Sequence, residues 1–248
     1  MAEKTLLKGL AVLEALGKSE KPRGVTDLAR ALEISKTAAH RLLQTLVSAG
    51  YVAKDNASDA YVLTTKTWEV GSAALARMDA KQVASKYLPG LAESSRESVH
   101  ITLLDGTDVV YVDKIDSAHP LRTHSAIGGR APAACVATGK ALLAFQSDEV
   151  VNKVAARLKR YTARTIISRT ALLKDLQKVR RRGYAVNNCE WRKDICSVGA
   201  PIFNAQHSVV AAVGISGPEY RIGHTLDKLG ALVARTAKEI SRELGYLE

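Results

Sequence analysis

The chain has 248 residues, 46% of them apolar and 25% charged, which is the composition of a folded protein and excludes a disordered tail. Its length suits two modest domains, and its apolar runs are too short for a membrane-spanning helix of about 18 residues, so we expect a cytoplasmic protein with no membrane partner. The net charge of +11 favours a polyanionic partner, above all nucleic acid.

The first part of the chain follows the order of a winged helix-turn-helix domain. Apolar residues at helical spacing predict a helix over 5–16, and a short helix capped by Thr26 follows. Ser35 is the expected N-cap of a longer helix, and two short β-prone runs then predict a hairpin over 51–63. We therefore assign residues 1–64 to a DNA-binding domain whose second motif helix enters the major groove.

The polar face of that second motif helix carries residue types that read base edges. They are Lys36, Thr37, His40, Arg41 and Gln44. Lys and Arg can pair with guanine and Gln with adenine, which makes these residues candidates for operator recognition. Residues expected to hold phosphates are Thr26, Ser35, Arg23 and Lys54. The alternative is a solvated polar face on a packing helix.

The domain is only weakly basic, with nine Lys and Arg against seven acids in residues 1–64. Because phosphate contacts dominate the affinity for DNA, a single copy would bind poorly. We therefore expect a homodimer or homotetramer on a two-fold double-stranded operator, paired through the helix at 5–16.

Residues 65–80 predict a linker helix, and residues 81–248 predict a second, α+β domain with a mostly antiparallel sheet flanked by helices. After a helix interrupted by Pro89, strands are expected at 99–104, 108–115 and 120–127. Helices follow at 135–145, 148–158 and 170–183, and then strands at 183–188, 196–204 and 208–216. A last helix is expected over 223–244.

A Gly-rich turn precedes the helix at 135–145. The free backbone amides of residues 136–139 would suit a small carboxylate at that helix end. Lys140, one turn into the helix, is either a surface cation or a partner for the bound anion. Ala141 breaks the GxxxxGK[ST] pattern after Lys140, which argues against a nucleotide.

Polar residues interrupt strands of the second domain that should be core. They are Asn187, Cys189, Glu190, Ser197 and Ser216, with Val99 and Ile195 as apolar wall. Because buried polar groups need partners, these side chains predict a ligand pocket. The alternative is that each points to solvent from the outer face of its strand.

The sequence carries no recognisable catalytic constellation. The six histidines lack a signature around any nucleophile, and Glu190 is the one acid expected near a ligand, so paired-carboxylate chemistry lacks a partner. The three cysteines lack a CxxC spacing and are odd in number, which argues against a disulfide framework and a structural metal. We expect a protein that is not an enzyme and that has no cofactor and no metal.

These segments together resemble the IclR family of bacterial transcriptional regulators over almost the whole chain. The resemblance rests on VTDLARALEISKTAAHRLLQTLVSAGYV, AYVLT, GGRAPAACVATGKALLA, RRRGYAVNNCEWRKDICSVGAPIF and VVAAVGISGP. It implies a winged-helix domain, a linker helix and a GAF-like effector domain. It further implies dimers or dimers of dimers on palindromic operators, and a response to a small organic or aromatic acid.

Carried over residue by residue, the family's ligand contacts fall on the backbone amides of Ala137 and Thr138 and on Asn187, Ser197, Gly214 and Ser216. Where relatives that bind small keto acids have an acid, a Cys and a Ser, this chain has Asn187, Ser197 and Gly214. That difference implies a different or larger effector. In the reading helix Thr37 alone keeps the hydroxyl pair often found in the family, which leaves the operator sequence open.

The charge excess lies in residues 151–182, which hold eleven Lys and Arg, three of them in the run Arg180 to Arg182, against the single acid Asp175. This basic stretch is either solvated, as charge runs usually are, or contacts flanking DNA or an acidic protein.

The leading hypothesis is a ligand-responsive transcriptional regulator of a metabolic operon, in which the effector shifts the placement of paired winged helices. One alternative is a GAF-like thiol redox sensor or enzyme that uses Cys135, Cys189 or Cys196. Another is an architectural DNA binder that ignores ligands.

Overall fold

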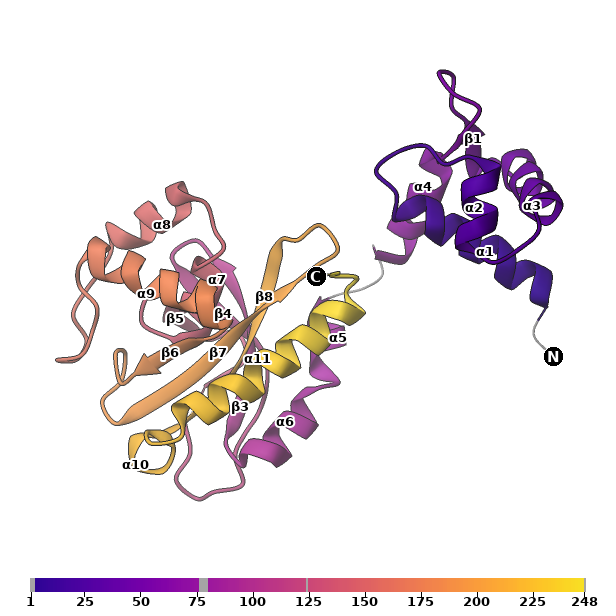
Figure 1. Cartoon of the computed structure of the whole chain (residues 1–248). Helices are drawn as coiled ribbons and strands as arrows, with labels where there is room; N and C mark the ends of the chain where they lie inside the picture. Colours follow the sequence, from indigo (N-terminus) through magenta and orange to yellow (C-terminus); the bar gives the residue numbers. More distant parts are fainter. Residues whose placement is uncertain (1–2, 76–79, 124, 248) are drawn as a thin grey trace. The chain divides into compact units, whose positions relative to one another are not determined.

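The computed structural model describes residues 3–75, 80–123 and 125–247 (Figure 1). The chain divides into two compact units, Met1–Arg77 and Met78–Glu248. The end of the expected linker helix, residues 76–79, lies outside the described residues, as does His124 within the expected strand 120–127.

The first unit is a helix-turn-helix followed by a hairpin. Its elements are α1 (Lys4–Gly17), α2 (Val25–Ala31), α3 (Lys36–Ser48), the antiparallel pair β1 (Val52–Lys54) and β2 (Tyr61–Leu63), and α4 (Thr65–Leu75). They enclose a small core made of Val12, Leu16, Leu28, Leu43, Val52 and Tyr61. Apolar side chains at helical spacing on α1 and α3 meet the hairpin in this core, as the sequence pattern requires.

The cap of α3 is confirmed, whereas the cap expected for α2 is wrong. Ser35 Oγ accepts a hydrogen bond from the Ala38 backbone nitrogen at 3.2 Å. Helix α2 begins one residue before Thr26, and its N-cap is Gly24, which makes no side-chain cap bond. An isolated β-bridge between Arg23 and Tyr61 holds the chain extended up to Gly24, so the helix can begin only after it.

The second unit is built on one six-stranded antiparallel sheet in the order β5-β4-β3-β8-β7-β6. The strands are β3 (Ser98–Asp105), β4 (Asp108–Ile115), β5 (Arg130–Pro132), β6 (Ala185–Asn188), β7 (Ile195–Phe203) and β8 (Val209–Pro218). The helices are α5 (Ala80–Ser85), α6 (Leu88–Ser95), α7 (Ala137–Leu143), α8 (Asp148–Ala155), α9 (Arg169–Arg182), α10 (Glu219–Ile222) and α11 (Leu226–Glu243).

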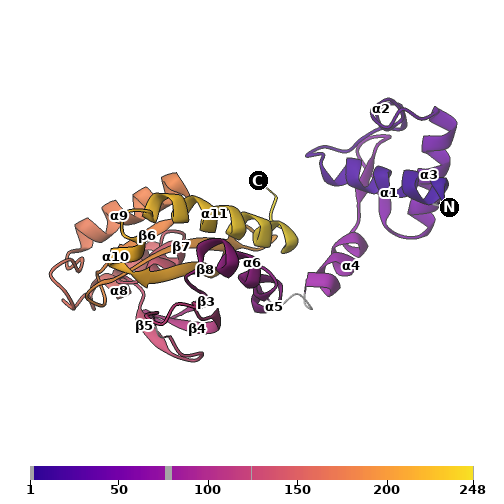
Figure 2. The ribbon, with the colours of Figure 1, turned by 90° about the horizontal axis from the view of Figure 1, so that it is seen from below.

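Helices cover both faces of this sheet. Helices α5, α6 and α11 share a core with the side chains of Val99, Ile101, Val198, Val213 and Ile215. Figure 2 shows α11 lying along β7 and β8, with α5 and α6 beside it. Helices α7, α8 and α9 share a second core, which contains Tyr111, Ala185 and Ala212. Because successive strand residues point to opposite faces, each of the central strands serves both cores.

The third strand of the expected meander is wrong. Of residues 120–127, those that the structure describes lie outside any helix or strand. The strand that pairs with β4 is the short β5, in register from Asp108 opposite Pro132 to Val110 opposite Arg130. The intervening loop is held by a side-chain hydrogen bond and not by backbone pairing with a strand: Thr123 Oγ1 lies 2.8 Å from Ser216 Oγ. Leu121 and Ile127 are exposed, whereas Thr123 is buried.

Candidate nucleic-acid interface and effector site

Helix α3 presents its polar residues to solvent. Lys36, Thr37, His40, Arg41 and Gln44 are all exposed, whereas Ala39 and Leu43 on the opposite side are buried. Gln44 Nε2 also donates a weak hydrogen bond to Tyr61 Oη at 3.4 Å, which links the helix to the hairpin. The structure thus brings the five predicted base readers to one accessible helix face, as a major-groove helix requires.

The residues predicted to hold phosphates differ in how available their charges are. Arg23 Nε pairs with Asp27 Oδ2 at 2.5 Å, and Lys54 pairs with Asp59 in the hairpin. Thr26 is exposed in the first turn of α2, and the Ser35 hydroxyl is engaged as the cap of α3. Both cations of this set are therefore already balanced by acids of the same domain.

A groove between α1 and α3 supplies cations that the sequence reading missed. It has a volume of about 230 Å³ and is lined by Lys4, Thr5, Lys8, Ala38, Arg41, Leu42 and Thr45. Lys4 and Lys8 lie on α1, which the sequence assigned to pairing alone. Their spacing of four residues indicated that they share one face of α1, and the structure shows that this face borders α3.

The second unit carries a row of polar side chains across the face of the sheet that α7 covers. We call it the polar row, and its members are Ser98, His100 and Thr102 on β3, Gly214 and Ser216 on β8, Ser197 on β7 and Asn187 on β6. Register places Ser216 between Ser98 and Ser197, and His100 opposite Gly214. Five of these side chains, from β3, β6 and β7, are at most 5% exposed. A buried sheet face this polar needs partners for its atoms.

Several atoms of the polar row have no protein partner among the described residues. They include His100 Nδ1 and Thr102 Oγ1, and Thr138 Oγ1 on α7 joins them. Burial lowers the pKa of His100 to about 4, so its imidazole is neutral at pH 7. Asn187 Nδ2 donates to Ser197 Oγ at 3.1 Å, which pairs two members at one end of the row. Unpartnered buried donors and acceptors mark a place where a polar ligand would be stabilised.

Helix α7 packs directly onto the polar row. A Cβ atom on Gly214 would lie 2.6 Å from Thr138 Cγ2 and 2.9 Å from His100 Nε2, so only a glycine lets these groups approach. The helix begins after Val136, which makes no side-chain cap bond. The N-terminal end of α7 and the predicted contacts Ala137 and Thr138 therefore lie over the centre of the row.

Lys140 is not a surface cation. It is 1% exposed, and its Nζ lies 2.7 Å from Glu190 Oε1 and 2.8 Å from Asp175 Oδ2. Burial raises the pKa of Glu190, and Lys140 opposes that rise. The expectation of a surface cation is therefore wrong, because Lys140 is buried between two carboxylates. A role of Lys140 or Glu190 toward a ligand stays a prediction.

The structure separates Cys189 from the other predicted effector residues. Its Sγ lies 3.1 Å from that of Cys196, and both cysteines belong to the core on the α11 side of the sheet. Cys189 also borders a pocket whose lining includes none of the polar row. Sequence reasoning missed His100 and Thr102. Their signal was the alternation SVHIT, where polar residues at every second position of a central strand face a covering helix instead of water.

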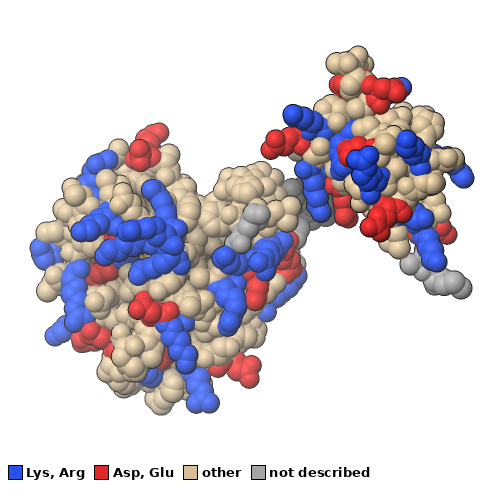
Figure 3. All heavy atoms as spheres, viewed as in Figure 1, with Lys and Arg blue, Asp and Glu red and all other residues tan. Residues whose placement is uncertain are grey.

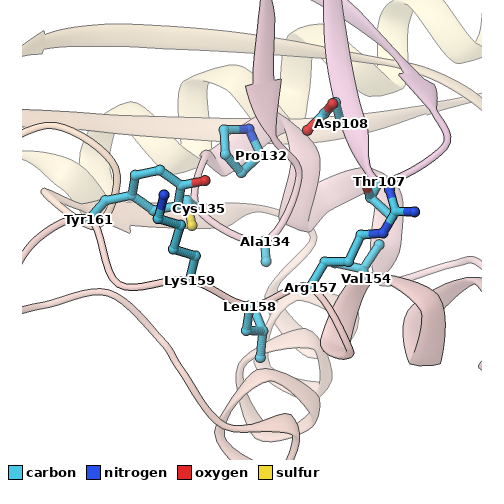
Figure 4. Close-up of a pocket in the computed structure, with 10 residues that line it drawn as sticks. All are labelled: Thr107, Asp108, Pro132, Ala134, Cys135, Val154, Arg157, Leu158, Lys159 and Tyr161. Atoms are coloured by element: carbon cyan, nitrogen blue, oxygen red, sulfur yellow. The ribbon is translucent and has the colours of Figure 1, made fainter.

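Cys135 borders a separate pocket of about 210 Å³ (Figure 4). In Figure 4, Cys135, Lys159 and Tyr161 lie at one end of this pocket and Thr107 and Arg157 at the other. Burial raises the pKa of the Cys135 thiol to about 11, so the group is protonated at neutral pH. A thiol in this state is a poor nucleophile, which disfavours Cys135 as a redox sensor.

The basic stretch forms one surface of the second unit. Figure 3 shows Lys and Arg gathered over α8 and α9. Not all of these cations are simply solvated: Arg180 donates to the Ala144 carbonyl, and Arg182 Nε donates to the Tyr184 carbonyl at 2.7 Å. Lys174, Lys178 and Arg181 are exposed on α9.

Two family models match the chain. The IclR helix-turn-helix domain matches residues 5–56, and the bacterial transcriptional regulator IclR C-terminal domain matches residues 72–242. No helix among the described residues is long and apolar enough to cross a membrane.

The chain is similar to known transcriptional regulators over nearly their whole length. The HTH-type transcriptional regulator KdgR of Escherichia coli strain K12 is 36% identical over 245 residues, covering 98% of this chain and 93% of that protein. The transcriptional repressor IclR of the same strain is 31% identical over 246 residues, covering 97% and 90%.

Solved structures show the same fold. The crystal structure of Thermotoga maritima IclR is 31% identical with a TM-score of 0.64 and covers 98% of this chain and 99% of that one. The Agobacterium tumefaciens repressor BlcR, at 24% identity, aligns with a TM-score of 0.85 over 98% of both chains.

Proposed function

Because the chain belongs to the IclR family of bacterial transcriptional regulators, and is therefore a DNA-binding, ligand-responsive regulator, we propose which residues read DNA and which hold the effector. The exposed face of α3 reads base edges through Lys36, Thr37, His40, Arg41 and Gln44. Phosphates are held by Lys4 and Lys8 in the groove beside α3, together with the predicted set Thr26, Ser35, Arg23 and Lys54. The protein acts in the cytoplasm on a double-stranded operator.

We infer that the regulator pairs through α1 to cover a two-fold operator. Three α1 leucines that do not reach the core support this: Leu6, Leu7 and Leu10 are 62%, 55% and 47% exposed. A stripe of exposed leucines next to a recognition helix leaves apolar surface in contact with water unless a second copy of the chain covers it. Pairing also doubles the weak positive charge of the domain, which strengthens phosphate binding.

The effector of this proposal is a small organic or aromatic acid bound between α7 and the polar row. The unpartnered buried atoms His100 Nδ1, Thr102 Oγ1 and Thr138 Oγ1 carry this part of the proposal, since each would gain a partner from a polar ligand. Asn187, Ser197 and Ser216 complete the contacts, with the amides of Ala137 and Thr138 at the helix end. Gly214 leaves room that Thr138 now fills, so the ligand binds by displacing that side chain.

We infer that the effector is bound and released without chemical change. The polar row offers hydroxyls, an amide and a neutral imidazole, which are hydrogen-bonding groups. Effector and operator are then linked reciprocally, so an effector that weakens DNA binding must itself bind more weakly to the DNA complex.

The effector proposal is tested by thermal unfolding of the full chain against a panel of small carboxylates, aromatic acids and sugar acids. A ligand at 100 times its dissociation constant stabilises the native state by about 2.7 kcal/mol. We expect one class to raise the melting temperature, and the double variant N187A/S197A to lose the shift. The exposed loop variant S208A is the matched control and keeps it. A shift that survives in N187A/S197A would place the ligand elsewhere.

The DNA proposal is tested by selecting duplexes from a random library with the full chain and measuring their affinity for variants. We expect a palindromic consensus, and R41A and Q44A each to lose about 1–3 kcal/mol at one base position. K8A should weaken binding equally for all sequences and reduce the salt slope by about 1. A consensus unchanged in R41A and Q44A would remove α3 from base reading.

A further inference from the structure

Three potential metal ligands meet at one end of the sheet in the second unit. Cys189 follows the last residue of β6, Cys196 is the second residue of β7, and Glu219 is the first residue after β8. Strands β8, β7 and β6 are neighbours in the sheet and run antiparallel. The end of β6, the start of β7 and the end of β8 therefore lie at the same end of the sheet. Residues 30 apart in sequence are thus neighbours in space.

The ligand atoms converge as well as the backbones. The two Sγ atoms are 3.1 Å apart, and the two sulfurs and a carboxylate oxygen of Glu219 all lie within 4.8 Å of one another. We propose that Cys189, Cys196 and Glu219 bind a thiophilic divalent cation of the Zn²⁺ class. Two thiolates and a carboxylate are ligands that Zn²⁺ takes in protein sites.

The sulfur separation favours a metal over a disulfide. Two thiolates on a tetrahedral Zn²⁺, each about 2.3 Å from the metal, are about 3.8 Å apart, whereas bonded sulfurs are about 2.05 Å apart. The observed 3.1 Å needs a smaller movement to reach the first distance than the second. A disulfide would engage the two sulfurs alone, whereas a cation engages all three groups.

The backbone around the ligands is held in place without a metal. The Cys189 carbonyl accepts from Thr162 Oγ1 at 2.8 Å, and the Glu219 backbone nitrogen donates to the Asp194 carbonyl at 2.8 Å. Cys196 pairs in register with Asn188 and Gly217. Each ligand is therefore attached to a fixed hydrogen bond or strand, which lowers the entropy cost of ordering the site.

A solvent-open pocket of about 350 Å³ gives the cation a path and a free coordination position. Its lining includes Cys189 and Glu219, with Arg164 and Lys193 beside them. Two thiolates, a carboxylate and a divalent cation sum to one negative charge, which these two basic residues offset. Arg164 already pairs with Glu219, one oxygen of which lies within 4.8 Å of both sulfurs. On binding, two thiol protons leave to water and no electron is transferred.

This cation site is separate from the effector site. Cys196 points to the α11 side of the sheet, where it joins the core with Val198, whereas the next residue, Ser197, belongs to the polar row on the α7 side. Residues adjacent in a strand face opposite ways, so a cation held by Cys196 cannot contact the effector. Spacing alone misses the site, because the ligands are seven and 23 residues apart and share no CxxC motif.

Cobalt binding to the reduced full chain tests the proposal, since Co²⁺ replaces Zn²⁺ and is coloured. We expect sulfur-to-cobalt charge-transfer absorption and the visible bands of four-coordinate Co²⁺, saturating at one equivalent per chain and bleached by Zn²⁺. C189S and C196S should each lose most of the charge-transfer band. C135S, which removes the third buried thiol, is the matched control and should retain it. E219Q should weaken Co²⁺ binding at least about tenfold, whereas E149Q on the exposed side of α8 should not.

Unfolding of the same variants separates lost ligands from lost structure. Serine is close to cysteine in size, so metal-free C189S and C196S should melt near the wild-type temperature, and Zn²⁺ should raise that temperature in the wild type alone. The proposal is overturned if reduced wild type shows no charge-transfer band, or if the double variant C189S/C196S keeps it. A reduced chain that binds no Co²⁺ but forms the 189–196 disulfide in a glutathione buffer would likewise replace the metal site by a redox pair.

Discussion

Removing the positive charge of Lys140 should strongly destabilise the second unit. Its Nζ is shared by Glu190, at 2.7 and 2.9 Å from the two carboxylate oxygens, and by Asp175 at 2.8 Å. The Lys140 and Glu190 side chains are 1% and 8% exposed, whereas Asp175, at 18%, can turn to water. In K140M the carboxylate of Glu190 stays buried without a cation beside it, which costs about 3–5 kcal/mol.

The accompanying pH dependence has a definite sign. Burial raises the pKa of Glu190 and Lys140 opposes the rise, so the pKa in K140M lies higher still. When the pKa of a carboxyl is higher in the folded than in the unfolded state, the free energy of unfolding decreases as the pH rises above the pKa of the unfolded state. The deficit of K140M against the wild type should therefore be larger at pH 8 than at pH 5.

This cost is measured by urea and thermal unfolding, followed by the fluorescence of Trp191. The exposed Trp68 is changed to Phe in all of these variants, so that Trp191 alone gives the signal. K140M should lower the melting temperature by roughly 6–20 °C, which corresponds to its lost free energy in a unit of this size. The double variant K140M/E190Q should recover to within about 1 kcal/mol, since the amide oxygen of the introduced glutamine can still accept from the Asn188 nitrogen. K153M breaks an exposed pair with Glu149 and should cost at most about 0.5 kcal/mol. A small cost for K140M, or a double variant as unstable as the single, would refute the reasoning.

Three further results are expected. His100, whose pKa is lowered to about 4, binds a proton in the unfolded but not the native state, so stability should fall by up to about 3 kcal/mol as pH drops from 6.5 to 4, and H100Q should remove that fall in acid titrations of unfolding. G214A places a Cβ 2.6 Å from Thr138 Cγ2 and should cost about 1–3 kcal/mol in denaturant unfolding, with an unchanged midpoint contradicting the close packing. Charge reversal of the exposed Lys174, Lys178 and Arg181 should not change the salt slope of DNA binding, because cations that do not contact phosphates release no counterions from DNA. The control K228E/R235E on α11 should show the same slope. A slope lower by about 3 would place this face on DNA.

Local patterns in the sequence were sufficient for the first unit. Helical spacing of leucines, a serine before α3 and turn residues between two short strands specify contacts between near neighbours, and the structure reproduces them. The exception is Thr26, because the end of the preceding loop is set by the bridge from Arg23 to Tyr61, a contact between residues far apart in the chain.

The resemblance to the IclR family identified the protein class, and strand periodicity predicted five of the six strands in the second unit. It missed β5 and expected a strand at 120–127 instead, whereas the position beside β4 is occupied by β5. Periodicity records which face a residue could take, and the sheet order decides whether that face exists.

The functional sites show the same division. Sequence alone indicated which residue types are available: hydroxyls and an amide in strands, a lysine in a Gly-rich helix start, three scattered cysteines. The tertiary structure decided their surroundings. Lys140 turned inward to two carboxylates, His100 became neutral under α7, and Cys189 met Cys196 on the other face of the sheet. Charge state and ligation depend on burial and on partners distant in sequence, and no local pattern contains either.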